Sequence, residues 1–261
     1  MDKERFQELW QPVADGLFGK QKPAHMQQPT CEVRPVGKIV GDLCQIPEEQ
    51  WAQYAFSREP LNGRLNDDQR RELMHQAVEC GRHYAKELSE TYNTRDPRVI
   101  AEKLGLYVDY PRIPQNTDRV LFAEFREPNK IHIYTDSIWK AENLMSEPGV
   151  REALTDRLDI TGLILGHELF HVVEEQNKKT IWTHTHRIRL WSLGFLHNDS
   201  RLLVLGEIAA MAFTRALAQI PYSPYVMDAF LVYGYSPMAA SALYEEMMEL
   251  TGHPVTDKRI S

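Results

Sequence analysis

The residues best suited to chemistry are two histidines and a glutamate in the segment His167-Glu168-Leu169-Phe170-His171, an HExxH motif. On an α-helix, positions i and i+4 lie about 40° apart, so both imidazoles project from one face. Two neutral imidazoles at this spacing can bind Zn²⁺, and the carboxylate beside them can act as a base without being a ligand. The spacing therefore predicts His167 and His171 as metal ligands and Glu168 as the catalytic residue.

The sequence around the motif is apolar and compatible with a helix. Residues 163–166 before the motif and residues 172–173 after it carry no charge. Two imidazoles and a carboxylate in such surroundings need partners, because burying them unpaired is costly. The alternative to a metal ion is a pair of core histidines that are hydrogen-bonded to neighbouring groups. The fit of the motif to a zinc site favours the metal.

A catalytic zinc ion needs a third protein ligand and an open coordination position. The metzincin pattern would place glycine at position 174 and histidine at position 177, but the chain has Glu174 and Asn177, which excludes that class. Glu207 is better placed, because it is the only charged residue between Arg201 and Arg215. A lone carboxylate in so apolar a helix needs a cation, and a metal ion supplies one.

Other residues are alternatives for these roles. By residue type alone, the third ligand could also be His184, His186 or His197. Glu207 has an alternative role in a buried ion pair with Arg215 or another arginine. A tyrosine or histidine near the metal could stabilise an oxyanion or contact the substrate. The candidates for such contacts are His184, His186, Tyr222 and Tyr225.

The order of these segments resembles that of the ImmA/IrrE family of zinc metallopeptidases. In that family, HExxH is followed by a glutamate-led segment of the form E-x-x-A-N-x-F-A that ends near a proline. Here the second segment begins 36 positions after His171, as EIAAMAFTRALAQIP, and Glu207, Ala210 and Phe213 match the pattern. The upstream segments PRVIAEKLGLYV and KIHIYT also resemble the family. The similarity spans residues 70–221, with Met211 where the family usually has asparagine.

This resemblance implies a zincin-like metallopeptidase that carries one Zn²⁺ per chain and hydrolyses a peptide bond in a specific protein or peptide substrate. By analogy with the family, the substrate would be a transcriptional repressor or a stress regulator. The alternative function is a metal-binding interaction module of zincin fold that sequesters a partner without catalysis. The presence of Glu168 favours the enzyme, whereas a closed site with His184 or His186 as a fourth ligand would favour the module. Manganese or another divalent ion remains an alternative to zinc.

Hydrophobic periodicity and capping residues predict the elements that position these side chains. Strands are expected at 106–110, 120–125 and 131–134, the last two joined by a turn at 127–130. Helices are expected at 66–92, 97–104, 136–146, 156–176, 201–218, 224–234 and 237–251. The prediction is an α+β fold in which a small, mainly antiparallel sheet packs on a helical layer that carries HExxH. The strand nearest the metal is expected to offer an edge to an extended peptide substrate.

The chain divides by composition into three parts. Residues 1–65 contain six of the fifteen prolines and are expected to form a Pro-rich arm, extended or irregular apart from a short helix near residues 5–10. Residues 66–221 are the predicted zincin-like domain, and residues 222–261 the predicted C-terminal helical pair packed on it. The segment 177–199 gives no clear pattern.

Charge and cysteine content limit the classes of partner. Thirty basic against thirty-seven acidic residues give a net charge of −7, which argues against direct nucleic-acid binding. Three cysteines without a CxxC pair give no disulfide framework, and no apolar run approaches the length of a membrane span. A cytoplasmic protein that does not bind membranes is the expectation.

Overall fold

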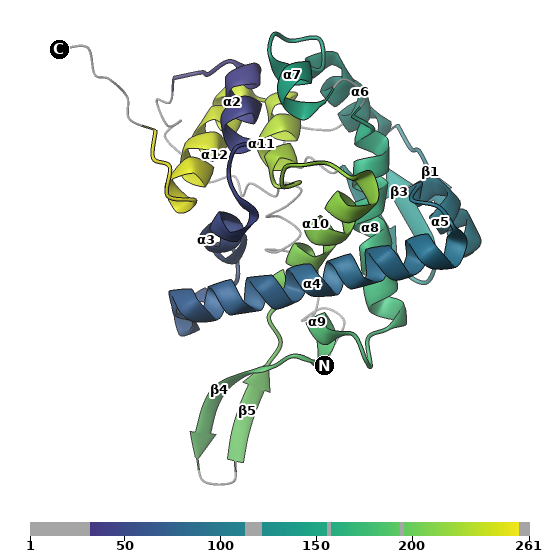
Figure 1. Cartoon of the computed structure of the whole chain (residues 1–261), viewed down its shortest axis with the longest axis vertical. Helices are drawn as coiled ribbons and strands as arrows, with labels where there is room; N and C mark the ends of the chain where they lie inside the picture. Colours follow the sequence, from purple (N-terminus) through teal and green to yellow (C-terminus); the bar gives the residue numbers. More distant parts are fainter. Residues whose placement is uncertain (1–31, 113–121, 156–157, 194–195, 256–261) are drawn as a thin grey trace, which may run out of the picture.

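The structure, a computed structural model, describes residues 32–112, 122–155, 158–193 and 196–255. It is an α+β fold, dominated by helices, with one small sheet and a separate two-stranded ribbon (Figure 1). The larger helices are α4 (Asp67–Tyr92), α6 (Thr135–Leu144), α8 (Ile160–Gln176), α10 (Val204–Ala218) and α12 (Pro237–Leu250). The shorter helices are α2 (Val36–Leu43), η1 (Glu48–Trp51), α3 (Ala52–Phe56), η2 (Asn62–Arg64), α5 (Pro97–Lys103), α7 (Val150–Leu154), α9 (Trp182–Thr185) and α11 (Val226–Tyr233).

The sheet contains the three predicted strands, β1 (Tyr107–Asp109), β2 (Ala123–Arg126) and β3 (Lys130–Ile133), in the order β1-β3-β2. β2 and β3 form the predicted antiparallel hairpin, whereas β1 pairs with β3 in parallel. The sheet is therefore mixed, and the prediction of a mainly antiparallel sheet needs this correction. The chain reverses direction between β1 and β2 and again in the hairpin, so that β3 lies between the two other strands and runs parallel to β1.

Helices α8 and α10 pack against each other in antiparallel fashion and carry the predicted metal ligands. Gly166 of α8 faces Thr214 of α10, and Gly206 of α10 faces Glu174 of α8. The long helix α4 crosses α10 at Gly81 (Figure 1). A Cβ atom on Gly81 would overlap the carbonyl oxygen of Ala209, so this close crossing requires glycine.

The predicted extended or irregular conformation of the N-terminal arm is wrong for residues 36–43, 48–56 and 62–64, which are helical. In α2 the residues Val36, Ile39, Val40 and Leu43 are all buried, on one face of the helix. Pro35 is the N-cap of α2 and Pro47 the N-cap of η1. These prolines start helices, since a helix tolerates proline where the N–H has no intrahelical partner. The expected helix near residues 5–10 lies outside the described residues.

The predicted start and stop signals are confirmed for most other helices. Asn66 and Gln69 form the capping box of α4, and Asp96 caps α5 ahead of a proline. Ser236 accepts a hydrogen bond from the backbone N–H of Ala239 at the start of α12. The helix predicted from residue 156 begins later, at Ile160, where Asp159 accepts a hydrogen bond from the backbone N–H of Gly162.

The segment 177–199 contains α9 and the first strand of a hairpin, β4 (Ile188–Leu193), whose partner is β5 (Leu196–Ser200). This hairpin projects from the body of the molecule (Figure 1). The alternation of apolar Ile188 and Leu190 with Arg189 was the strand signal that the sequence analysis missed. In the described part of the chain, no helix combines the length and the apolar character that a membrane span requires.

Candidate metal centre

Both histidines and the glutamate of the motif lie in the middle of α8. His167 and Glu168 are 3% and 4% exposed, and the side chain of His171 is 14% exposed. Glu207 lies in the first turn of α10 and is 5% exposed. The antiparallel packing of α8 and α10 therefore brings one carboxylate from α10 to the face of α8 that carries the two imidazoles.

The ligating atoms of these residues converge on one point. Oε2 of Glu207 lies 3.3 Å from Nε2 of His167 and 3.7 Å from Nε2 of His171. The two Nε2 atoms are 3.1 Å apart, and the three ligating atoms all lie within 4.8 Å of one another. Among the described residues this is the one such group that could hold a metal ion.

The chemistry of this group fits a divalent metal ion. Oε2 of Glu207 is buried and accepts no hydrogen bond from the described residues, so the carboxylate depends on cationic neighbours. Burial by itself would raise the pKa of Glu207, but the two imidazoles outweigh it and hold the pKa at about 2. Two imidazole nitrogens and one carboxylate oxygen form a known catalytic zinc donor set. His167, His171 and Glu207 are the residues that would hold the ion.

No family model, no curated protein and no solved structure matches this chain. The geometry of His167, His171 and Glu207 is therefore the feature of this chain that indicates a function. The resemblance to the ImmA/IrrE family stays a prediction from the order of the motifs.

Glu168 lies beside the three ligands but does not belong to their group. Burial raises the pKa of its carboxyl, and the nearby His171 and His167 lower it by less. The backbone N–H of Phe125 in β2 lies near this carboxylate and also lowers its pKa. This contact places the edge strand of the sheet next to the centre.

Glu174 lies behind the candidate ligand His171, and the sequence analysis did not identify it as a site residue. Its Oε2 lies 3.6 Å from Nδ1 of His171, and its Oε1 accepts a hydrogen bond of 2.6 Å from Oγ1 of Thr183. Gly206 provides the space, since a Cβ there would lie 2.7 Å from Oε1 of Glu174. A carboxylate behind a metal-bound histidine fixes the ring and its tautomer. The i, i+3 spacing from His171 was the available signal.

The alternative third ligands take other positions. His184 lies 3.5 Å from Oε1 of Glu174, and the ring of His186 lies 4.8 Å from that of Trp182. His197 is on the projecting strand β5, 3.5 Å from Asp199. None of the three histidines joins the group of described residues that could hold a metal ion.

The alternative prediction of an ion pair between Glu207 and Arg215 is wrong. Nη1 of Arg215 instead lies 2.8 Å from Oε1 of Glu48, in the N-terminal part of the chain. The lone carboxylate of α10 thus interacts with the imidazoles of α8.

The two candidate tyrosines differ in their surroundings. The hydroxyl of Tyr222 donates a hydrogen bond to the backbone oxygen of Leu154, 2.9 Å away, and is satisfied there. The hydroxyl of Tyr225 is buried without a hydrogen-bond partner in the described structure. Burial raises the pKa of Tyr225, and the charges of Asp228 and Glu207 raise it further. Of the two tyrosines, Tyr225 is the one whose hydroxyl has no partner among the described residues, and its contact with an oxyanion or the substrate stays a prediction.

Proposed function

We propose that this chain is a zinc-dependent metallopeptidase of the ImmA/IrrE type, which hydrolyses a peptide bond in a protein substrate such as a transcriptional regulator. The observation that carries this proposal is the convergence of His167, His171 and Glu207 with Glu168 beside them. Three protein ligands leave one coordination position open, as catalytic zinc sites do, whereas structural sites are closed by four. A structural site would also have no use for a carboxylate placed next to the ligands.

The chain's own residues supply the proton transfers. Bound zinc would polarise the scissile carbonyl and favour ionisation of a water molecule. Glu168 takes the proton of the attacking water on its carboxylate and delivers it to the leaving amine. Glu174, through His171, keeps that ligand in the orientation that points Nε2 at the centre.

The position of β2 supports an extended peptide as substrate. β2 is an edge strand of the sheet, and Phe125 of β2 contacts Glu168. An extended peptide can add to such an edge through main-chain hydrogen bonds. A substrate bound alongside β2 would pass close to the carboxylate that moves the proton.

The experiment is peptide cleavage with controlled metal content. The full chain is incubated with a proteome-derived peptide library, and new termini are identified by mass spectrometry. We expect cleavage in the presence of zinc. A chelator should abolish it, and added zinc should restore it. Glu175→Gln, which changes a carboxylate of α8 outside the centre, should cleave as the unmodified chain does. Cleavage that persists in the chelator would contradict the proposal, and metal binding without any cleavage would favour the interaction module.

A further inference from the structure

The hairpin of β4 and β5, which projects from the body of the molecule, has one apolar face (Figure 1). Residues directly opposite each other in an antiparallel ladder point to the same face, and the two faces alternate along each strand. By this register, Ile188, Trp191 and Leu196 share one face, and Arg189 and Asp199 share the other. A bulge between Arg189 and Trp191 adds one residue to β4, which keeps Trp191 on the face of Ile188.

The outer part of the apolar face is exposed to solvent. Ile188, nearest to the body, packs against the hydrophobic core, but Trp191 is 51% exposed and Leu196 is 54% exposed. These two side chains are diagonal neighbours across the ladder, within reach of each other. A two-stranded hairpin is only marginally stable in water, and adjoining exposed apolar side chains mark interaction surfaces. The hairpin therefore has the character of a binding arm.

A groove of about 660 Å³ lies between α4 and α9, at the base of the hairpin. Trp182 lines it from α9, and the residues from Glu72 to Tyr84 that line it belong to α4. This stretch of α4 is about 18 Å long, at 1.5 Å per residue. β4 has six residues and is about 20 Å long. The groove thus matches one strand of the hairpin in length.

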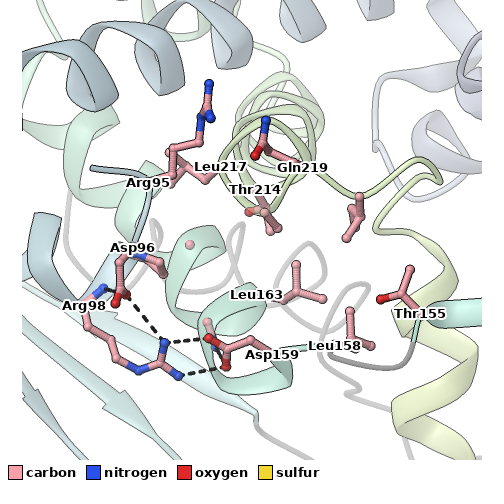
Figure 2. A pocket seen from close by; sticks show the side chains of 15 residues that line it. Arg95, Asp96, Arg98, Thr155, Leu158, Asp159, Leu163, Thr214, Leu217 and Gln219 are labelled. Carbon is pink, nitrogen blue, oxygen red and sulfur yellow. Dashed lines mark hydrogen bonds and ion pairs between the residues drawn. The ribbon is translucent and has the colours of Figure 1, made fainter. Parts of the chain in front are cut away.

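The lining of the groove is acidic. Glu72 and Glu79 line it, and no described lysine or arginine does. Glu79 pairs with Arg82, at 2.9 Å, whereas Glu72 forms no ion pair with a described residue. The cavity between α5, α8 and α10 differs, because the two arginines and two aspartates in its lining balance (Figure 2). The groove retains a negative charge, which favours a cationic partner.

The hairpin supplies the complementary charge. Arg189 pairs with Asp199, at 2.9 Å, but Arg187 is exposed at the start of β4 and forms no ion pair with a described residue. The hairpin extends away from α4 of its own chain (Figure 1), so it does not fill its own groove. We propose that two copies of this chain form a dimer in which the hairpin of each copy lies in the groove of the other.

In this dimer, Trp191 and Leu196 pack against the partner's Trp182 and the apolar part of the groove, and Arg187 lies near the partner's Glu72. A two-fold axis makes each contact twice and closes the assembly at two chains. The proposal does not depend on peptidase activity at the metal centre.

The first test is sedimentation velocity of the full chain, in a chelator, at protein concentrations up to about 100 µM. A reversible equilibrium between monomer and dimer is expected. Trp191→Ser combined with Leu196→Ser should raise the dissociation constant of the dimer at least about tenfold. Trp139→Ser, which changes a 63% exposed tryptophan of α6, should leave it unchanged. A chain that stays monomeric, or a dimer that the hairpin substitutions do not weaken, would overturn the proposal.

An exchange of charge between two variants tests the arrangement. Glu72→Arg in the groove and Arg187→Glu at the hairpin should each weaken self-association about fivefold, because like charges then meet twice in the dimer. Both positions are exposed, so the melting temperature should not change. An equimolar mixture of the two variants should dimerise about as strongly as the unmodified chain, since every such contact in the mixed dimer joins opposite charges. A mixture that associates no better than either variant alone would contradict the placement of the hairpin in the groove.

Discussion

Glu59 accepts a hydrogen bond of 3.1 Å from the backbone N–H of Val204, the first residue of α10. Glu59 is 5% exposed and lies 145 positions earlier in the chain. The N-cap residue Leu203 has no side chain that could make this bond. A carboxylate at this end of a helix satisfies a free N–H and interacts favourably with the helix dipole. The N-terminal part of the chain thus stabilises the turn that carries Glu207.

Glu59→Ala is expected to lower the free energy of unfolding by about 2 kcal/mol, because it leaves a buried N–H unpaired at the start of α10. Urea denaturation monitored by circular dichroism measures this change. Glu49→Ala, at an exposed position in the same part of the chain, should change stability by less than about 0.5 kcal/mol. Equal stability of the two variants would show that the contact with Val204 contributes nothing.

Glu174→Gln is expected to weaken metal binding without removing a ligand. The neutral amide no longer stabilises the orientation of His171, and the loss of such an outer carboxylate costs about 10- to 100-fold in metal affinity. Competition with a fluorescent chelator measures the affinity. Glu175→Gln serves as the matched control on the next residue of α8. An affinity that is unchanged by Glu174→Gln would mean that this carboxylate does not support His171.

Gly81→Ala is expected to destabilise the fold strongly, by about 3 kcal/mol, because the new methyl group collides with the backbone of α10 at Ala209. Gly41→Ala provides the contrast, since Gly41 lies inside α2 with no atom within 4 Å of the added Cβ. That second variant should gain about 0.5–1 kcal/mol. Thermal unfolding of both variants tests the crossing of α4 over α10. Similar effects of the two substitutions would contradict it.

The buried carboxyl of Asp228 is expected to make the stability of the fold depend on pH. Burial raises the pKa of its carboxyl from 3.8 to about 7, although Tyr54 donates a hydrogen bond to it and Arg58 lies nearby. Between these two pH values the folded chain retains a proton that the unfolded chain releases. The contribution of Asp228 to the free energy of unfolding therefore falls as pH rises through this window and is constant above it.

Asp228→Asn should remove this contribution. Urea denaturation at about pH 4 and about pH 8, in a chelator, compares the two chains at both ends of the window. The stability of the unmodified chain relative to the variant should be lower at the higher pH. An identical pH dependence of the two chains would show that Asp228 ionises normally in the fold.

The convergence of His167, His171 and Glu207 could be predicted from the sequence because each member carries a local signal. The i, i+4 spacing places His167 and His171 on one helix face, and Glu207 is conspicuous as a carboxylate in an apolar helix. Glu174 has the i, i+3 spacing from His171, but its role depends on the space that Gly206 leaves. Such space is a property of helix packing, which one sequence does not display.

The fold could be predicted where capping residues mark the start of a helix, as at Asn66 and Ser236. The fold could not be predicted where one residue type is common in two kinds of local structure. Proline suggested an irregular arm, but Pro35 and Pro47 start helices, and only the burial of the following apolar face decides between the two. The parallel pairing of β1 with β3 is likewise a tertiary feature, because strand propensity is the same in either direction.

The most direct test of the peptidase mechanism measures zinc content and peptide cleavage in the same samples of the unmodified chain, Glu168→Gln and Glu207→Gln. Glu207→Gln weakens a ligand, so its zinc content should fall, and stability with it. Glu168→Gln should keep one zinc ion per chain and lose cleavage by a factor on the order of 10²–10⁴, because only the base is removed. A Glu168→Gln chain that binds zinc and still cleaves like the unmodified chain would contradict the mechanism.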